Sequence, residues 1–343
     1  MDRAVTMRQV ADAAGVSPAT VSRALSGSQQ VDPELRARVV ASAQRLGYRT
    51  NRVARALRTR STGTVGMVVP NITNPFFPVV IQAVEHELRQ HNVRLLLCDS
   101  ADDVGQEAEL LRILLDHRID GILISACDRI ASRSAIRMAA GLVPVVQVDR
   151  VAVADLHFVG VDQHAAMAAV VDHLVDLGCR RFAYVSSSTH ISTSMERLRS
   201  YARLVRAVDE PSAGRTYIGD FSLEWGREAA RRICDEHDLP DAIVCANDLV
   251  AAGVLQVMEE RGTAVPGEVV VTGFDDTVLA TVSRPQLTTI RQPLAEIGRE
   301  AVEAVLSAGP RSPVNGSLLS AELVVRESTN LGSASKVRVT PGT

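Results

Sequence analysis

The sequence predicts a small all-α head joined to an α/β core that is built from two doubly wound parallel-sheet subdomains. Three short helical patterns with capping residues fill the first 49 residues, and apolar strands then alternate with amphipathic helices in two series. The charge divides at the same place: residues 1–62 hold 11 arginines and 4 acidic residues, whereas the remainder holds 26 basic and 36 acidic residues. A basic head on an acidic body predicts a head that meets a polyanion and a body with a different task.

Composition excludes several protein classes. The five cysteines are scattered over 343 residues and form no CxxC pair, so neither a disulfide framework nor a metal site is expected. The sequence has no run of 18 uncharged apolar residues, so no membrane span is expected. The N-terminus lacks the basic-then-apolar pattern of a secretory signal, which predicts a cytoplasmic protein.

The first two helical patterns of the head are separated by a tight turn. Thr6 and Gln9 have the spacing of a capping box, and Gly15 supplies a left-handed stop. Ser17 then stands at an N-cap position, and Pro18 occupies the first helical position, where its missing N–H costs nothing. Followed by a third pattern over residues 32–47, this arrangement predicts a helix-turn-helix.

The second pattern, residues 18–25, carries side chains that suit DNA. The outward hydroxyls of Thr20 and Ser22 are expected to hydrogen-bond phosphate oxygens, and a helix N-terminus favours anions. Arg23 has the reach and the two-pronged donor geometry that fit the O6/N7 edge of guanine. A helical hairpin for protein contacts is the alternative, and the excess of arginine in the head argues against it.

The run NRVARALR, residues 51–58, places arginines on one side of a two-turn helix and apolar residues on the other. An isolated helix this short is marginal in water. We therefore expect the segment to fold on DNA, with Asn51 and the arginines facing phosphates. Leu57 would then enter the minor groove as an apolar wedge that kinks the duplex.

After Thr64, continuous apolar strands alternate with amphipathic helices, and a second such series begins after Asp162. The pattern predicts two parallel sheets covered on both faces, whose ligands bind beyond the carboxyl ends of the strands. The polar and aromatic residues at or near those ends are Asn74, Phe76, Phe77, Asp149, Arg150, Asp162, Arg197, Phe221, Asn247, Asp248 and Asp275, with Gln292 in a segment that returns to the first series.

Taken together, these residues suit a small polyhydroxylated ring with an apolar face. Aromatic side chains pack against such a face, and the side chains of arginine, aspartate and asparagine can each form two hydrogen bonds to neighbouring hydroxyls. Taken singly, each residue is better explained as an N-cap, a turn residue or a surface pair. Only the joint pattern predicts a binding site for a small effector.

Two other classes share this kind of core. The sequence lacks the motifs G-x-S-x-G, G-x-G-x-x-G and H-E-x-x-H, which argues against an enzyme. No catalytic residue is therefore expected. The only lysine, Lys336, lies near the C-terminus, which excludes a P-loop or Schiff-base lysine in the body. A sugar-binding transport protein is opposed by the missing signal pattern and the basic head.

The head resembles the DNA-binding region of the LacI/GalR family of bacterial repressors. The runs V-A-x-x-A-G-V-S-x-x-T-V-S-R-x-L from Val10 and L-G-Y-x-x-N-x-x-A-x-x-L from Leu46 carry the similarity, which continues to about Asn330. The resemblance implies a sequence-specific transcriptional regulator, usually a repressor, that binds a pseudo-palindromic operator as a homodimer. It also implies control by a small-molecule effector, with no cofactor.

The resemblance assigns roles to head and hinge residues. The base-contacting positions of the family fall on Pro18, Ala19 and Arg23 of a helix placed in the major groove, and the paired hinges of a dimer would pack through Val53 and Ala54. The full set of expected DNA contacts is Thr6, Ser17, Pro18, Ala19, Thr20, Ser22, Arg23, Asn51, Arg52, Ala54 and Leu57.

The body is similar to periplasmic sugar-binding proteins of the type I, two-lobed fold. Their pentose-binding pattern matches Asn74, Phe76, Phe77, Asp149, Arg150, Arg197, Asn247, Asp275 and Gln292, and the expected effector site also includes Cys127, Asp162, Thr193 and Phe221. A monosaccharide effector that releases the protein from DNA is predicted. A nucleobase or nucleoside remains the alternative, because a purine-sensing branch uses the same positions and the run SSSTHISTSMER, residues 186–197, departs from both branches.

The predicted boundaries follow from these assignments. The head covers residues 1–49, the hinge helix and linker 50–62, the effector-binding and dimerisation core 63–330, and a disordered tail 331–343. The first lobe of the core is expected at about 63–161 plus 290–320, and the second at about 162–289 plus 321–330. The tail has no leucine heptads, so a dimer is expected rather than a tetramer.

Overall fold

A computed structural model describes residues 5–25, 31–48, 61–208, 215–236, 238–308 and 316–331. The chain divides into two compact units, residues 1–62 and 63–343. Most of the predicted hinge, including Asn51, Arg52, Ala54 and Leu57, lies outside the described residues, as does the tail from residue 332. None of the described helices is long and apolar enough to cross a membrane.

The described residues of the first unit form three helices around a small apolar core. They are α1 (Met7–Ala14), α2 (Pro18–Leu25) and α3 (Pro33–Arg45). The predicted capping box is confirmed, since the side chain of Thr6 accepts from the backbone of Gln9 and that of Gln9 accepts from Thr6. Gly15 is left-handed, with φ of 65°, and the hydroxyl of Ser17 accepts from the N–H of Thr20. Local capping therefore fixes the turn between α1 and α2.

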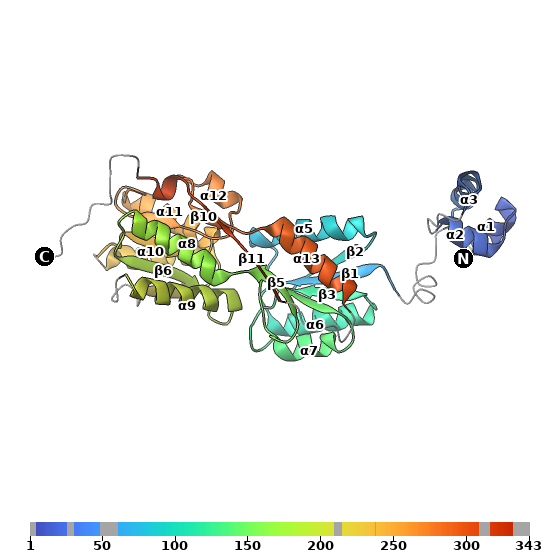
Figure 1. Ribbon diagram of the computed structural model, residues 1–343, viewed down its shortest axis with the longest axis horizontal. Helices are drawn as coiled ribbons and strands as arrows, with labels where there is room; N and C mark the ends of the chain where they lie inside the picture. Colours follow the sequence, from blue (N-terminus) through green and yellow to red (C-terminus); the bar gives the residue numbers. More distant parts are fainter. Residues whose placement is uncertain are drawn as a thin grey trace. The chain divides into compact units, whose positions relative to one another are not determined.

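The first lobe of the larger unit is a six-stranded parallel sheet (Figure 1). Its strands, in spatial order, are β11 (Gly316–Leu319), β5 (His157–Val161), β4 (Val145–Val148), β3 (Gly121–Ile124), β1 (Thr64–Val69) and β2 (Arg94–Asp99). Helices α5 (Phe76–Gln90) and α13 (Leu294–Ser307) lie on one face, and α6 (Val104–Asp116) and α7 (Arg133–Ala140) on the other. The central strands are buried on both faces, as their continuous apolar sequences predict.

The second lobe is a four-stranded parallel sheet in the order β7 (Thr216–Gly219), β6 (Phe182–Ser187), β8 (Ala242–Cys245) and β9 (Val270–Thr272). Alternate residues of its central strands pack with α8 (Gln163–Asp176) and α9 (Ser192–Arg206) on one face. The others pack with α10 (Leu223–Asp235) and α11 (Asp248–Arg261) on the opposite face. The short helices α12 (Val278–Val282) and η2 (Glu327–Thr329) complete the lobe.

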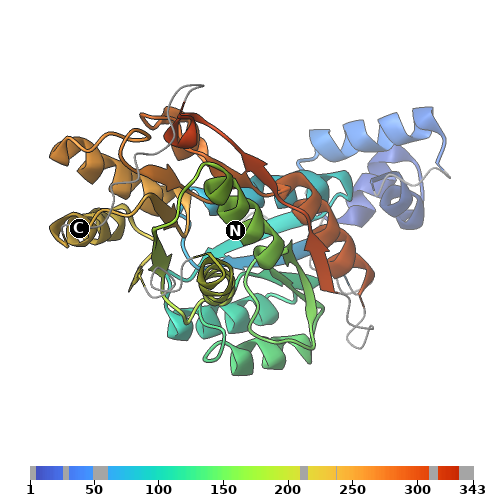
Figure 2. The same ribbon diagram turned by 60° about the vertical axis from the view of Figure 1, so that its left-hand side comes forward.

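The chain passes between the lobes three times (Figures 1 and 2): after β5, between β10 (Thr289–Arg291) and α13, and between β11 and β12 (Glu322–Val324). Strands β10 and β12 pair antiparallel in a small sheet of their own, which the sequence did not predict. The prediction of two doubly wound parallel-sheet subdomains is confirmed. The crossings allow the two lobes to face each other across a cleft at strand ends.

Helices α10 and α11 approach each other closely through two glycines. A Cβ on Gly226 would lie 2.1 Å from the carbonyl oxygen of Val250, and a Cβ on Gly253 would lie 2.2 Å from that of Leu223. Both obstacles are backbone atoms, so a rotamer change cannot relieve them. The absence of a side chain at these positions therefore sets the separation of the two helices.

Gly226→Ala is expected to destabilise the second lobe, although alanine is normally the better helix former. Overpacking of a closed interface costs about 1–3 kcal/mol, which a thermal melt would record as a lower Tm. Gly316→Ala is the control, since a Cβ there meets nothing within 4 Å. Equal melting temperatures for both variants would contradict the close packing of α10 on α11.

Candidate functional site

The surface of α2 is the candidate DNA-contacting surface of the head. Ser17, Pro18, Ala19 and Arg23 are exposed on it, whereas Val21 is fully buried in the core. Thr20 is half-buried, and its hydroxyl lies 2.9 Å from that of Ser17. The hydroxyl of Thr20 thus takes part in capping the helix, and the predicted polar outer face is carried by the exposed residues around it.

An inner pocket in the cleft between the lobes gathers most of the predicted effector residues. Its lining comprises Asn74, Phe76, Phe77, Asp149, Arg150, Thr193, Arg197, Phe221, Asn247 and Asp275. The pocket is small, with a cavity of about 10 Å³, which is the room that about one water needs. Residues separated by up to 201 positions therefore meet at one point, between the strand ends of the two lobes.

Arg197 is the centre of the inner pocket and is only 3% exposed. Its Nε donates to Oε1 of Gln163 at 2.7 Å and its Nη1 to the carbonyl oxygen of Ala246 at 2.6 Å. The guanidinium also lies 3.5 Å from the ring centroid of Phe274. These contacts hold the guanidinium in one orientation, so that it presents a fixed donor to the cleft.

Asp149 and Arg150 follow β4 and contribute from the first lobe. Asp149 has φ of 66°, a left-handed conformation that non-glycine residues rarely adopt, and such strain is concentrated at binding sites. Within the described part of the chain, Oδ1 of Asp149 and Nη1 of Arg150 are buried without a hydrogen-bond partner. A ligand hydroxyl can donate to such a buried acceptor and accept from such a buried donor.

The guanidinium of Arg150 lies near two aromatic rings, with its carbon 5.4 Å from the centroid of Phe77 and 5.8 Å from that of Phe221. Phe76 packs edge-on against Phe77 with ring centroids 5.2 Å apart. The pocket therefore combines hydrogen-bonding groups with apolar ring faces. This pairing suits a molecule that is polar at its edge and apolar on its face.

Asp275 follows β9 and contributes from the second lobe, with φ of 102°. Its Oδ1 accepts from Nε2 of Gln292 at 2.8 Å and lies 3.7 Å from Nη2 of Arg197. Burial raises the pKa of Asp275 to about 8, and the nearby Arg197 offsets this only in part. Gln292 thus lies behind the pocket and holds Asp275, rather than forming its wall.

Burial also raises the pKa of Asp149, against the opposing effect of Arg197 and Arg150. Asn247 has a structural task in addition to lining the pocket, because its Oδ1 accepts from Val250 and caps α11. Thr193, in the first turn of α9, completes the wall. Helix ends and buried side chains therefore position the site, and it does not depend on surface loops alone.

An outer chamber with a cavity of about 510 Å³ shares Asn74, Arg150 and Phe221 with the inner pocket. Cys127 lines this chamber rather than the inner pocket, and its Sγ lies 3.0 Å from the hydroxyl of Ser100. Burial raises the pKa of the Cys127 thiol to about 12, so the thiol stays protonated and acts as a neutral wall.

The outer chamber contains residues that were not predicted from the sequence. They are Asn71, Asp102, Val104, Asp128, Ser187, Ser188, His190, Ile191, Asp220 and Ser222. Four of them belong to the run 186–197, whose departure from the known sequence patterns was the one signal that the sequence offered. Bonds cross between the lobes beside it: the N–H of Arg129 donates to the carbonyl oxygen of His190 at 2.8 Å, and that of Val151 to the hydroxyl of Ser192 at 2.8 Å.

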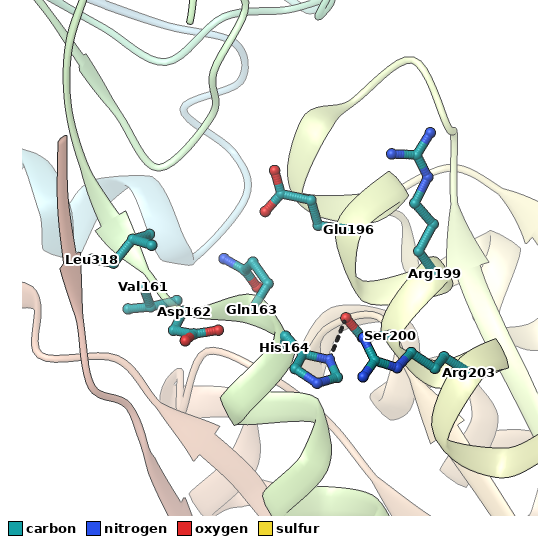
Figure 3. A pocket seen from close by; sticks show the side chains of 9 residues that line it. All are labelled: Val161, Asp162, Gln163, His164, Glu196, Arg199, Ser200, Arg203 and Leu318. Atoms are coloured by element: carbon teal, nitrogen blue, oxygen red, sulfur yellow. Dashed lines mark hydrogen bonds between the residues drawn. The ribbon is translucent and has the colours of Figure 1, made fainter. Parts of the chain in front are cut away.

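Asp162, which is also predicted to contact the effector, lines neither the inner pocket nor the outer chamber. Asp162 caps α8 through a 2.9 Å bond from the N–H of Ala165 to its Oδ1, and it lines a separate hollow (Figure 3). This hollow also contains His164, whose Nδ1 lies 3.2 Å from the hydroxyl of Ser200. Asp162 follows a strand as Asp149 does, but its carboxylate turns back to the helix that it begins.

Comparison with known proteins places this architecture in a family. Residues 6–51 match the bacterial regulatory proteins of the lacI family, and residues 171–329 match a periplasmic binding protein-like domain. The chain is 31% identical over 319 residues to catabolite control protein A of Priestia megaterium, covering 92% of this chain and 96% of that protein. The chain belongs to the LacI family. It is a DNA-binding transcriptional regulator with an effector-binding core, and not an enzyme.

Solved structures of LacI-family proteins share its fold. A lac repressor dimer bound to operator and an anti-inducer has a TM-score of 0.83 and 25% identity, covering 95% of this chain and 99% of that one. A complex of the regulator CelR with cellobiose has a TM-score of 0.71 and 28% identity, covering 94% and 99%. The predicted fold class and the resemblance to the family are confirmed.

The raised pKa of Asp275 has a consequence for stability. Between its ordinary value of 3.8 and about 8, the folded protein holds a proton that the unfolded chain has lost, so this group lowers stability as the pH rises through that range. Asp275→Asn is expected to remove the effect, and the Tm of the variant relative to the natural protein should rise between pH 5 and pH 8. A pH-independent difference in Tm would contradict the buried, protonated state of Asp275.

Proposed function

We propose that the protein is a repressor that binds a pseudo-palindromic operator as a homodimer and is released by a sugar bound in the cleft. The lac repressor structure, a dimer bound to operator, supports the DNA half of this proposal. The CelR structure, a complex with cellobiose, supports the sugar half. Because its target is chromosomal DNA, we place the protein in the cytoplasm, with no cofactor beyond the effector.

On the DNA side, α2 would lie in the major groove with its exposed N-terminal end toward the bases. Pro18 and Ala19 offer only apolar surface, which suits contact with a thymine methyl group. Arg23 carries the main discrimination by donating to a guanine edge. Thr6, Ser17, Thr20 and Ser22 contribute contacts to the backbone phosphates.

On the effector side, the observation that carries the proposal is that Asp149 and Arg150, which line the inner pocket with Arg197, each hold a buried polar atom without a hydrogen-bond partner among the described residues. Vicinal hydroxyls of a sugar satisfy a buried acceptor and donor at once, and the aromatic rings cover the apolar face of the sugar. The hydrogen bonds between the lobes lie beside the cleft, so a ligand bound there can shift the equilibrium between two arrangements of the lobes. Release from DNA requires the sugar to bind the DNA-incompetent arrangement more tightly.

Titration calorimetry of the full chain with glucose, galactose, ribose, cellobiose, maltose, adenosine and guanine tests the effector class. We expect at least one sugar to bind, and we expect the nucleoside and the nucleobase to give no heat. Binding of adenosine or guanine without any sugar would overturn the sugar assignment while leaving the regulator intact.

Arg23→Ala is expected to relax specificity at one operator position at a cost of about 1–3 kcal/mol. The measurement is binding to a set of single-base operator variants that derive from a site selected from random DNA. Arg38→Ala, an exposed arginine of α3, is the matched control and should change the affinity for all variants alike. An equal loss across all variants for Arg23→Ala would make Arg23 a phosphate contact instead.

Leu57→Ala should lose operator bending and specific affinity while sugar binding stays intact, because the apolar wedge is removed from the minor groove. Energy transfer between dyes at the two operator ends measures the bend, and calorimetry measures the sugar. Ala56→Ser, a small change next to the wedge, is the control. An unchanged bend in Leu57→Ala would refute the wedge.

A further inference from the structure

The hollow that Asp162 lines is separate from the effector cleft (Figure 3). Among the described residues, it shares no lining side chain with the inner pocket or the outer chamber. Its cavity of about 360 Å³ is at the lower end of the range for small-molecule sites. Its walls come from β5 and β11 of the first lobe and from α8 and α9 of the second. A molecule bound there would therefore contact both lobes.

Two buried polar side chains, Gln163 and Ser200, form part of the wall of this hollow. The hydroxyl of Ser200 lies 3.2 Å from Nδ1 of His164, which lines the hollow as well. Oε1 of Gln163 accepts from Nε of Arg197 at 2.7 Å. Gln163 therefore lines this hollow and also holds the central arginine of the inner pocket, which links the two sites directly.

Two exposed arginines of α9, Arg199 and Arg203, line the hollow one helical turn apart. Neither forms a salt bridge within the described part of the chain, although Arg199 acts electrostatically on Glu196. By contrast, Arg227 and Arg232 of α10 each form a salt bridge with a glutamate. Like charges at this spacing repel each other. An anionic group bound in the hollow would relieve that repulsion and accept charge-assisted hydrogen bonds.

Two carboxylates, those of Asp162 and Glu196, line the same hollow. Asp162 is half-buried and caps α8, whereas Glu196 is exposed. Two carboxylates against two arginines leave the lining without a net charge when His164 is neutral. A doubly charged phosphate group would be repelled by the carboxylates, and a simple amine by the arginines. A ligand that carries one anionic and one cationic group matches both pairs.

The apolar part of the wall is made by Val161 and Leu318. Figure 3 shows both on the side of the hollow away from Arg199 and Arg203. Leu318 is 62% exposed, although it belongs to a strand of the first lobe. An aliphatic group that covers Leu318 removes apolar surface from water, which favours binding.

We propose that this hollow is a second ligand site, which takes a free α-amino acid with an aliphatic side chain. The arginines Arg199 and Arg203 bind its carboxylate, Glu196 binds its ammonium group, and Leu318 packs against its side chain. Occupancy of the hollow acts on the inner pocket through Gln163 and so changes the affinity for DNA. The site does not depend on which molecule binds in the cleft.

The test is calorimetry of the full chain with leucine and with three compounds that each lack one of its groups. Leucinamide lacks the carboxylate, 4-methylpentanoate lacks the ammonium group, and glycine lacks the aliphatic side chain. We expect leucine to bind and each of the three to bind at least about tenfold more weakly, a difference of about 1.4 kcal/mol. Inorganic phosphate, added as a further probe, should give no heat.

Arg203→Ala should weaken the binding of leucine about tenfold, because it removes one of the two cations that bind the carboxylate. The matched control is Arg206→Ala, an exposed arginine of the same helix that does not line the hollow and should leave the affinity unchanged. Glu196→Gln should weaken leucine and leave 4-methylpentanoate, which has no ammonium group, unaffected. Thermal melts show whether the three variants are folded.

Fluorescence anisotropy of a labelled operator, selected from random DNA, tests the effect on DNA binding. Saturating leucine should change the operator affinity of the natural protein at least about fivefold. The Arg206→Ala variant should respond in the same way, and Arg203→Ala should not respond at the same leucine concentration.

Each failure would overturn a different part of the proposal. No heat with leucine, or equal loss of leucine binding in Arg203→Ala and Arg206→Ala, would overturn the site. Binding of phosphate, or of leucinamide or 4-methylpentanoate as tightly as leucine, would overturn the amino-acid ligand. An operator affinity that leucine does not change would overturn the link through Gln163. None of these results would affect the sugar proposed for the cleft, which the sugar panel tests separately.

Discussion

The structure of the cleft depends on the buried arginine Arg197, whose guanidinium needs hydrogen-bond partners from several segments. The guanidinium of Arg197 is almost completely removed from water, and a charge in that position is tolerated only when neighbouring groups compensate it. Gln163 and Ala246 accept hydrogen bonds from the guanidinium, Oδ1 of Asp275 lies 3.7 Å from its Nη2, and Phe274 lies against its face. Removal of a partner from a buried charge lowers the stability of a protein by about 3–5 kcal/mol. The contacts of Arg197 therefore favour a single relative position of the segments that carry its partners.

The site also contains strained and buried polar groups besides Arg197. Asp149 and Asp275 stand at strand ends in left-handed conformations, and burial raises the pKa of both. Such groups are costly in the protein alone and gain partners from a polar ligand. The strain therefore favours binding, and because the two aspartates belong to different lobes, binding also acts on the relation between the lobes.

The sequence predicted local features well because they depend on neighbouring residues. The capping box of Thr6 and the left-handed Gly15 need only a few residues to form, and the strand-end position of Asp149 follows from the alternation of strands and helices. The cap that Asp162 forms on α8 could not be told from a ligand contact, because both roles place an aspartate after a strand. Sequence alone does not tell which way the carboxylate turns.

Features that depend on distant segments were beyond the sequence. The antiparallel pair β10–β12 joins strands about 30 residues apart, and the outer chamber combines loops of both lobes. The contact between Gly226 and Val250 likewise depends on how two helices approach each other. In each case, packing between segments that are distant in the sequence decides which residues meet, and the local sequence pattern does not indicate it.

The most direct test of the account is the effect of sugar on DNA binding when the buried arginine is removed. Fluorescence anisotropy would follow a labelled operator bound to the full chain while the tightest-binding sugar of the calorimetric panel is added. We expect the sugar to release DNA from the natural protein and to leave the complex of a folded Arg197→Met variant intact. Equal release from both proteins at the same sugar concentration would contradict the central role of the cleft.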